Sequence, residues 1–233
     1  IQVGTSPGND VISEIRLLSG DAGVNYDFCE HPYAILSGHV SHDQILNGRR
    51  DPGEDPIANV EVRLVDSAGN EVDRQRTDAN GFYEFTRLSQ ATYTVQEFQP
   101  IEWQDGGDAA GTVTSFDSSI VAETRGIVAN PDQDTISQVS LNWGDRAINY
   151  DFGEFLLGGI RGRVHLSTSD EDCFGEEHDE GGIEGVQLRL LDESGNQVGL
   201  TTTDVDGNYS FIDLKPGIYR VEEIHPTEYA NGG

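Results

Sequence analysis

The sequence predicts an all-β protein built from tandem β-sandwich domains of the immunoglobulin-like type, and three observations support this. One stretch is written twice: residues 60–100 recur as residues 186–226, with 17 of 41 aligned positions identical. Short runs of alternating apolar residues are separated by turn residues about every ten positions. The 28 glycines among 233 residues suit many short strands joined by tight turns. A repeat of this length is a small domain rather than one turn of a solenoid.

The complete domain is predicted to span residues 35–157, and its elements follow in order. Strands are expected at ILSGHV, VEVRLVD, the run through Gln75, FYEF and TYTVQEF, with turns at SAGN and TDANG. A polar loop follows the first strand. A long Gly- and Asp-rich connection, roughly residues 101–131, precedes a closing pair of strands. No segment shows a convincing helical period.

A second, shorter repeat sets the domain boundaries. Residues 9–30 match residues 133–154 at 11 of 22 positions, and each copy is expected to form two strands around a Gly-Asp turn. The later copy closes the complete domain. The boundaries predicted from this are residues 1–34 as the C-terminal strands of a preceding domain, residues 35–157 as a complete domain, and residues 158–233 as the N-terminal part of a further domain.

The last predicted domain lacks the closing strands that the first 30 residues carry. Joining Gly233 to Ile1 would leave 16 residues between Pro226 and Asp10, against 33 between Pro100 and Asp134, which is a workable loop. We therefore interpret the segment as one period of a longer array, with residues 158–233 completed by residues 1–34 of a neighbouring copy. The expected partners are other copies of the chain, arranged head to tail.

The charge of the chain excludes some classes of partner. It carries 42 acidic and 14 basic residues, a formal net charge of −28. Such a polyanion repels nucleic acid and anionic membranes and attracts cations or basic partners. No apolar run of membrane length and no signal-peptide pattern occurs. The chain begins at Ile1 and contains no Met, so we interpret it as a processed or excised segment.

An enzymatic function is disfavoured by the distribution of reactive side chains. The six histidines are scattered along the chain, and no Ser/His/Asp or Cys/His spacing, phosphate-binding loop or zinc signature is present. A fold alone implies no activity. We therefore expect no catalysis.

The strongest candidate site is the twelve-residue stretch DQILNGRRDPGE, residues 43–54. It has the spacing of an EF-hand loop, in which hard oxygen donors converge on one cation and a glycine permits the sharp turn. The expected ligands are Asp43, Asn47, the backbone carbonyl of Arg49, Asp51 and Glu54. Position 3 of the pattern is Ile45, so one ligand is missing, and the alternative is a solvated acidic loop shaped by Pro52 and Gly53.

A second acidic loop, DEDCFGEEHDE, precedes the second copy of the long repeat. Its candidate ligands are Asp170, Asp172, Glu177 and Glu180. Cys173 and Phe174 stand where a ligand and the glycine are expected, so this site is weaker. A cation would relieve the repulsion among its carboxylates, although solvent screening of an open loop would also do so.

The motifs together resemble a known family. The pattern N-G-x-x-D-P-G-E, followed by V-x-V-x-L-x-D-x-x-G-N, T-D-x-x-G-x-Y-x-F and Y-x-V-x-E, resembles the B domains of serine-aspartate-repeat (Sdr) surface adhesins. These are similar to the Cna-B domains of collagen adhesins, which have a transthyretin-like β-sandwich. The resemblance covers essentially the whole chain. It implies a Ca²⁺-stiffened stalk module of a large, extracellular bacterial surface protein, which favours calcium at residues 43–54.

The two cysteines permit one disulfide in an oxidising compartment. Cys29 ends a closing strand and Cys173 lies in an acidic loop of a later domain, 144 residues away. In the joined array, Cys173 and Cys29 of the next copy share one domain, and we expect them to pair there. The alternative is two separate thiols.

Two functions are compatible with these observations. The first is a structural stalk or fibre shaft, made rigid by calcium and located on the cell surface or secreted. The second is an adhesin that captures a ligand through a sheet edge or the 101–131 connection. Trp103 and Trp143 are candidate contacts for such a ligand, although packing in the core or at a domain junction is the competing use of both.

Overall fold

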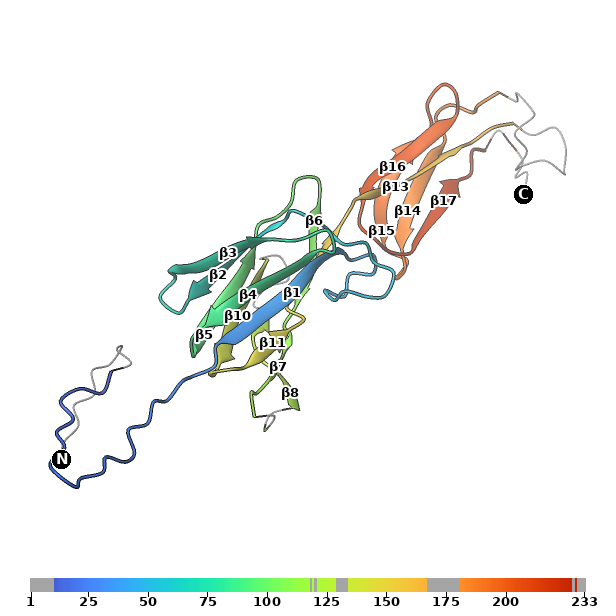
Figure 1. Cartoon of the computed structure of the whole chain (residues 1–233). Coiled ribbons are helices and arrows are strands. Elements are labelled where there is room, and N and C mark those ends of the chain that lie inside the picture. The colour runs from blue at the N-terminus through green and yellow to red at the C-terminus, as the bar shows by residue number, and fades with distance from the viewer. Residues whose placement is uncertain are drawn as a thin grey trace.

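The computed structural model describes residues 11–117, 119, 121–128, 134–166, 181–227 and 229. Figure 1 shows two bodies of strands end to end, with the N-terminal segment extending from the first body on the side away from the second. The described residues form strands and turns, and no helix there is long and apolar enough to cross a membrane. The all-β prediction is confirmed.

The first body is a sandwich of two sheets. One sheet has the order β6-β12-β1-β11-β7-β8, with β4 on the other edge of β1. Its strands are β1 (Ala34–His42), β4 (Phe82–Leu88), β6 (Gln104–Ala109), β7 (Thr112–Thr114), β8 (Val121–Thr124), β11 (Arg146–Ile148) and β12 (Asp151–Phe155). The other sheet has the order β3-β2-β5-β10-β9. Its strands are β2 (Glu61–Asp66), β3 (Glu71–Arg76), β5 (Ala91–Glu97), β9 (Ile127–Val128) and β10 (Thr135–Leu141).

The core lies between these sheets because apolar residues alternate along the strands. In β2, Val62 and Leu64 are fully buried, whereas Arg63 between them is only half-buried and donates a hydrogen bond from Nε to Gln96. Burying one large apolar side chain contributes about 1.5–3 kcal/mol. A register slip by one residue would expose this whole set, so the alternation fixes the strand pairing.

Strand β1 is central, and a glycine permits its close packing. It pairs antiparallel with β4, and its other edge pairs in parallel with β11 near its start and with β12 near its end. A Cβ at Gly38 would lie 1.7 Å from the backbone oxygen of Tyr150. That oxygen accepts a 2.5 Å hydrogen bond from the hydroxyl of Tyr83. A side chain at position 38 would therefore separate β1 from the segment that precedes β12.

Residues 101–131 correct one prediction, because part of this connection is regular structure. It contains β6, β7, β8 and β9. The sequence of β6, QDGGDA, has no apolar alternation and low β-propensity. It forms a strand because β12 supplies a hydrogen-bonding partner along its length, from Ala109 opposite Asp151 to Gln104 opposite Phe155. The signal for this strand therefore lies in β12 rather than in the local pattern.

The second body repeats only part of the first. Its strands are β13 (Gly158–Arg163), β14 (Gln187–Asp192), β15 (Gln197–Thr202), β16 (Asn208–Leu214) and β17 (Tyr219–Ile224). They form one pair, β13-β16, and one sheet of order β15-β14-β17. The four buried core residues are Val186, Leu188, Leu190 and Phe211. Strands β14 to β17 are the counterparts of β2 to β5, as the long repeat predicts, and β13 pairs with β16 as β1 pairs with β4.

Residues 11–33 differ from the expectation of two strands. The structure has a turn at Ser19 and Gly20 and no strand in these residues, and nearly all of their side chains are exposed. Strands require a hydrogen-bonding partner, and residues 11–33 pair with none of the strands that the structure describes. Its assignment to a preceding domain stays a prediction.

The two tryptophans serve packing. Trp103 is partly buried against the core of the first body, with its ring 5.0 Å from that of His42. Trp143 stacks on His31 at 4.9 Å and lies 6.3 Å from Tyr33. The segment that enters β1 is therefore held against the first body at its N-terminal end.

Candidate metal centre

The predicted loop of residues 43–54 is closed by its own polar groups. The carboxylate of Asp43 is fully buried and accepts hydrogen bonds from the backbone amides of Ile45 (3.2 Å) and Gly48 (2.6 Å). Glu54 accepts from the amides of Gln44 (3.1 Å) and Asp51 (2.8 Å). The sharp turn that the EF-hand pattern assigns to Gly48 is present, with φ of +70°.

The other predicted ligands also lie within this loop. Asn47 donates a 2.6 Å hydrogen bond to the Asp51 carboxylate and accepts a 2.8 Å one from the amide of Arg49. The predicted side chains are thus brought into one turn, in which amides of the loop supply hydrogen bonds to carboxylates. Calcium coordination by Asp43, Asn47, Arg49, Asp51 and Glu54 stays a prediction.

The second predicted loop lies outside the described residues. This applies to Asp170, Asp172, Cys173, Glu177 and Glu180. Cys29 is exposed and unbonded. The disulfide between Cys29 and Cys173 of a neighbouring copy also stays a prediction.

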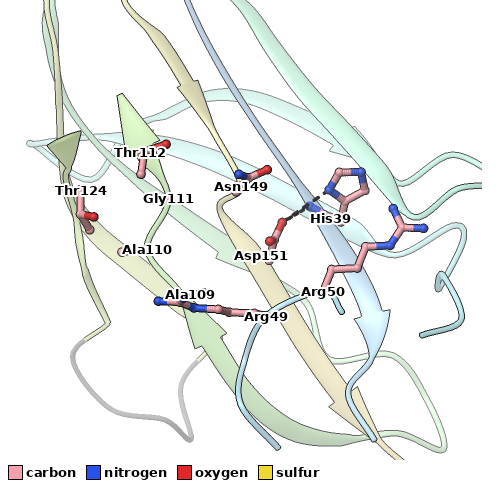
Figure 2. Close-up of a pocket in the computed structure, with 10 residues that line it drawn as sticks. All are labelled: His39, Arg49, Arg50, Ala109, Ala110, Gly111, Thr112, Thr124, Asn149 and Asp151. Atoms are coloured by element: carbon pink, nitrogen blue, oxygen red, sulfur yellow. Dashed lines mark hydrogen bonds and ion pairs between the residues drawn. The ribbon is translucent and has the colours of Figure 1, made fainter. Parts of the chain in front are cut away.

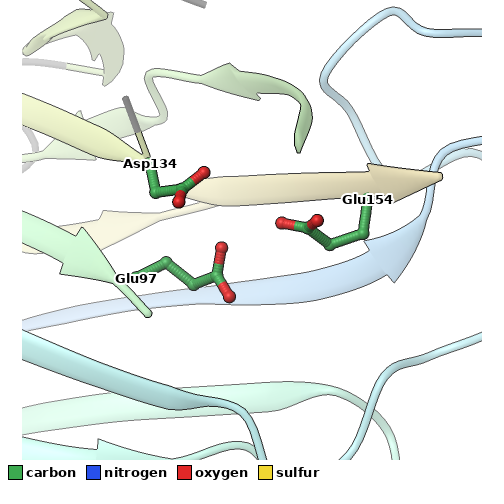
Figure 3. A group of neighbouring side chains, drawn as sticks. All are labelled: Glu97, Asp134 and Glu154. Carbon is green, nitrogen blue, oxygen red and sulfur yellow. The ribbon is translucent and has the colours of Figure 1, made fainter. Parts of the chain in front are cut away.

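Sequence reasoning missed a larger acidic centre inside the first body. Glu97 at the end of β5 and Asp134 just before β10 come from one sheet, and Glu154 in β12 comes from the other. Figure 3 shows their three carboxylates directed toward one another, and each offers an oxygen within 4.8 Å of the others. Asp134 also groups with Asp105 and Asp108 of β6 within the same limit. Five carboxylates therefore meet between the two sheets.

These carboxylates lack hydrogen-bond donors. Glu97 is 6% exposed and Glu154 is fully buried. Neither oxygen of Glu97 receives a hydrogen bond from the described residues, nor does one oxygen each of Glu154, Asp108 and Asp134. Their donors include Gln99 to Glu154, the amide of Thr135 to Asp108 at 3.1 Å, and the amide of Gly107 to Asp105 at 3.0 Å. A buried charge without a partner is costly, so the centre requires protons or a cation.

The electrostatics of the centre show the same deficit of positive charge. Burial, reinforced by repulsion from Glu154, raises the pKa of Glu97 far above its usual range. Burial and the charges of Asp105 and Asp134 raise the pKa of Asp108 to about 8. Burial and Asp105 raise the pKa of Asp134 to about 6. Burial also raises the pKa of Glu154, although its hydrogen bond from Gln99 opposes the rise.

The donor set suits a hard divalent cation. Ca²⁺ takes six to eight oxygen ligands at about 2.3–2.6 Å in flexible geometry, from carboxylates, carbonyls and water. The centre supplies carboxylate oxygens without nitrogen or sulfur, which disfavours zinc and copper. Because Glu97 and Asp134 belong to one sheet and Asp105, Asp108 and Glu154 to the other, a cation here would clamp the sandwich.

The predicted loop lies beside this centre. The amide of Asp43 donates a 2.8 Å hydrogen bond to the carbonyl of Glu154. A Cβ at Gly48 would lie 2.8 Å from the carbonyl oxygen of Asp108. The loop therefore packs on the strands that carry Asp108 and Glu154. A movement of the loop would shift the backbone of these strands, and a movement of the strands would shift the loop.

A weak signal for the centre is present in the sequence. Three of its acids recur in the shorter and longer repeats: Asp10 aligns with Asp134, Glu30 with Glu154, and Glu223 with Glu97. Asp105 and Asp108, in the motif DGGD, are ambiguous between turn and ligand. These positions are far apart in the chain, so they meet only when β6 pairs with β12, β5 pairs with β10, and the two sheets pack together.

A separate hollow on the first body carries positive charge. Its volume is about 340 Å³. Figure 2 shows the residues that line it, from Arg49 and Arg50 to Thr112 at the start of β7. Arg49 and Arg50 line it beside His39 and Asp151, whose ring nitrogen and carboxylate are 3.5 Å apart. Its other walls are backbone and small side chains of residues 109–112. It offers a place for a small anionic group.

Comparison with known proteins matches most of the chain to one domain family. The family model of the SdrD B-like domain matches residues 35–153 and 167–232. The serine-aspartate repeat-containing protein C of Staphylococcus aureus (strain N315) is 33% identical over 186 residues, which is 80% of this chain and 18% of that protein. The serine-aspartate repeat-containing protein D of strain Newman is 31% identical over 202 residues, 87% of this chain and 14% of that protein. The chain thus spans less than a fifth of these relatives.

Solved structures are more distant. A streptococcal ancillary pilin is 16% identical with a TM-score of 0.31, covering 84% of this chain and 56% of that one. BcpA, the major pilin subunit of Bacillus cereus, is 12% identical with a TM-score of 0.26, covering 82% and 87%. The assignment rests on the sequence match, which extends over most of both bodies. The chain belongs to the SdrD B-like domain family.

Proposed function

We propose that this chain is a non-catalytic structural module of a bacterial surface stalk, made rigid by Ca²⁺ bound at the acidic centre. The observation that carries the proposal is Glu97, which is 6% exposed with no hydrogen-bond donor on either oxygen. Asp134 and Glu154 lie next to it, and Asp105 and Asp108 group in turn with Asp134. A structural cation is the simplest occupant because it neutralises the centre and joins the two sheets.

Family membership and composition support an extracellular location. The named relatives are serine-aspartate repeat-containing proteins, and this chain has the same domain type in tandem. A net charge of −28 is tolerated where millimolar divalent cations are available. The residue 43–54 loop, with the ligands predicted above, is a second calcium site in this proposal.

The centre is placed to stiffen the link between the two bodies. Glu154 is followed immediately by Phe155, the last residue of β12, and the chain enters β13 at Gly158. Lys215 of the second body lies 5.7 Å from the centre of the Phe155 ring. A cation that fixes Glu154 also fixes the strand end from which the second body begins.

The test is a comparison of the chain with saturating calcium and with a chelator. We expect calcium to raise the melting temperature of the first body and to narrow the distribution of end-to-end lengths in small-angle scattering. Isothermal titration should show calcium binding at more than one site, and replacing Glu97 by Gln and Glu154 by Gln together should remove the binding at the acidic centre and leave that of the residue 43–54 loop. Equal melting curves with and without calcium would refute the proposal.

An adhesin role is the second candidate, and the hollow in Figure 2 is the observation that favours it. Arg49 and Arg50 face this hollow on an otherwise acidic chain, beside the 101–131 connection. A ligand carrying a carboxylate or sulfate group would fit there. The test is a screen of the chain against a panel of acidic glycans and peptides. Binding that is lost in the Arg49→Ala, Arg50→Ala double variant would support adhesion. If the chain binds none of these ligands, the stalk role stands alone.

A further inference from the structure

We propose that the hollow beside Arg49 and Arg50 binds one sugar unit of an acidic glycan, a ring that carries an anionic group and several hydroxyls. This inference names the ligand class for the adhesin role, the second candidate function above, and it rests on that role. All residues that line the hollow belong to the first body, with β1, β6 and β12 each contributing to it.

The two arginines of the hollow have no acidic partner. Neither Arg49 nor Arg50 forms an ion pair with any residue that the structure describes. Elsewhere in the first body Arg74, Arg76 and Arg125 each pair with a carboxylate. The chain has 42 acidic residues for its 14 basic ones, so acidic partners are abundant. A guanidinium binds a carboxylate or a sulfate through paired N–H donors, so two adjacent free guanidinium groups indicate an anionic ligand.

The backbone that carries the arginine pair is fixed by hydrogen bonds on both sides. On one side the amide of Gly48 donates a 2.6 Å hydrogen bond to Asp43. On the other side the amide of Asp51 donates a 2.8 Å hydrogen bond to Glu54. The arginine pair is therefore held beside the hollow before a ligand arrives, which reduces the entropy lost on binding.

The other polar groups of the hollow suit hydroxyls rather than a second anion. Thr112 and Thr124 line it with hydroxyls, Asn149 with an amide and Asp151 with a carboxylate. Asp151 accepts a 2.9 Å hydrogen bond from the amide of His39, and a carboxylate has further acceptor positions. It would repel an anionic group and accept a hydrogen bond from a hydroxyl. The ligand therefore combines an anionic group for the arginines with hydroxyl donors for Asp151.

The size and the walls of the hollow favour a sugar ring over a peptide. Its volume of about 340 Å³ lies at the lower end of the range for small-molecule sites. One wall is Ala109, Ala110 and Gly111, and no aromatic or large aliphatic side chain of the described residues lines the hollow. A Cβ at Gly111 would lie 2.0 Å from the carbonyl oxygen of Ile148, so this wall stays backbone. A peptide side chain would find no apolar contact here, whereas a sugar ring carries an anion and hydroxyls in a small volume.

The first experiment titrates the whole chain with small probes and follows backbone amide shifts by NMR. A salt concentration of about 0.15 M screens the repulsion from the net charge of −28. Glucuronic acid and a sulfate ester of N-acetylglucosamine carry both an anion and hydroxyls, glucose carries only hydroxyls, and glutarate carries only carboxylates. The tighter-binding acidic sugar identifies the anion, with a dissociation constant on the order of 1 mM. Glucose and glutarate should each bind about 10-fold more weakly or worse.

The arginine variants test whether the hollow is the site of binding. Arg49→Ala and Arg50→Ala together should weaken binding of the acidic sugar by about 10-fold or more, and the melting temperature should not change. The substitution at Arg49 keeps the backbone carbonyl that the predicted calcium loop uses. Arg146→Ala is the matched control, because it removes the same charge from an exposed position of β11 outside the hollow. It should leave the affinity unchanged.

Asp151→Asn distinguishes recognition of hydroxyls from simple attraction of an anion. Asparagine has nearly the same size and keeps an oxygen for the amide of His39, but its neutral oxygen is a weaker acceptor than a carboxylate. The acidic sugar should lose affinity by about 3-fold or more, whereas glutarate should gain affinity because a repelling charge is removed. Equal gains for both probes would overturn the assignment to a sugar. The comparison of probes on the unaltered chain does not depend on the folding of this variant.

A Glu-rich peptide and calcium provide the outcomes that contradict the inference. If the peptide binds through the two arginines more tightly than either acidic sugar, the adhesin role stands and the sugar assignment fails. If neither peptide nor sugar binds, both fail. Binding that requires calcium and survives the loss of both arginines would place the sugar on a cation instead of the hollow. The effect of calcium on melting is measured without these probes, so the stalk proposal is tested separately.

Discussion

Replacing Glu97 by Gln in the first body should change stability in opposite directions with and without calcium. Without a cation, the folded protein holds Glu97 protonated, since burial and Glu154 raise its pKa far above 4.5. In the unfolded chain the group is ionised at neutral pH. Folding without calcium therefore requires free energy to protonate Glu97. Glutamine has nearly the same shape and is uncharged in both the folded and the unfolded state, so the variant does not require this free energy.

The magnitude follows from the pKa difference. Keeping a carboxyl of pKa 4.5 protonated at about pH 7.5 costs about 4 kcal/mol, at about 1.4 kcal/mol per pH unit. The neighbouring carboxylates relax when the charge is absent, so we expect the calcium-free variant to gain about 1–3 kcal/mol. With calcium, the variant lacks a charged ligand. A 10- to 100-fold weaker affinity lowers the calcium-linked stabilisation by about 1.4–2.8 kcal/mol.

Urea unfolding monitored by tryptophan fluorescence, with calcium and with a chelator, measures both changes, since Trp103 packs on the core of the first body. Glu84→Gln is the matched control: it removes the same formal charge from an exposed position of β4. The control should shift stability by less than about 0.5 kcal/mol in either buffer. If Glu97→Gln destabilises the protein equally in both buffers, then Glu97 neither lowers the stability of the calcium-free protein nor binds calcium.

Three further predictions test the centre, the predicted loop and the packing of β1. Without calcium, the melting temperature should fall as pH rises from about 4 to about 8, because the pKa values of Asp108 and Asp134 are raised in the folded protein. With calcium bound, the melting temperature should depend less on pH. If Asp43 is a calcium ligand, Asp43→Asn should destabilise the chain more in calcium than in chelator. An equal loss of stability of about 1–2 kcal/mol in both buffers would show that Asp43 only accepts the hydrogen bonds from the amides of Ile45 and Gly48. Gly38→Ala should destabilise the first body in urea by about 3 kcal/mol or more, while Gly181→Ala, whose Cβ meets nothing within 4 Å, should be neutral.

The sandwich could be predicted because its signals are local and repeated. Alternation in VEVRLVD and the Gly-Asn turn each appear twice, and the structure confirms both copies as β2 and β14 with the following turns. The strand β6 could not be predicted, since QDGGDA becomes a strand only through β12. The same non-local pairing assembles the acidic centre: Glu97 and Glu154 are 57 residues apart and meet only after both sheets form.

The two closing blocks show how far a strand depends on its partner. Residues 11–30 and 135–154 share most of their apolar and turn residues, yet only the later block forms strands. Leu141 is 1% exposed beside β5, whereas its counterpart Leu17 is 56% exposed. The intrinsic preference of the residues is similar, so the difference comes from the sheet edge that one block has and the other lacks.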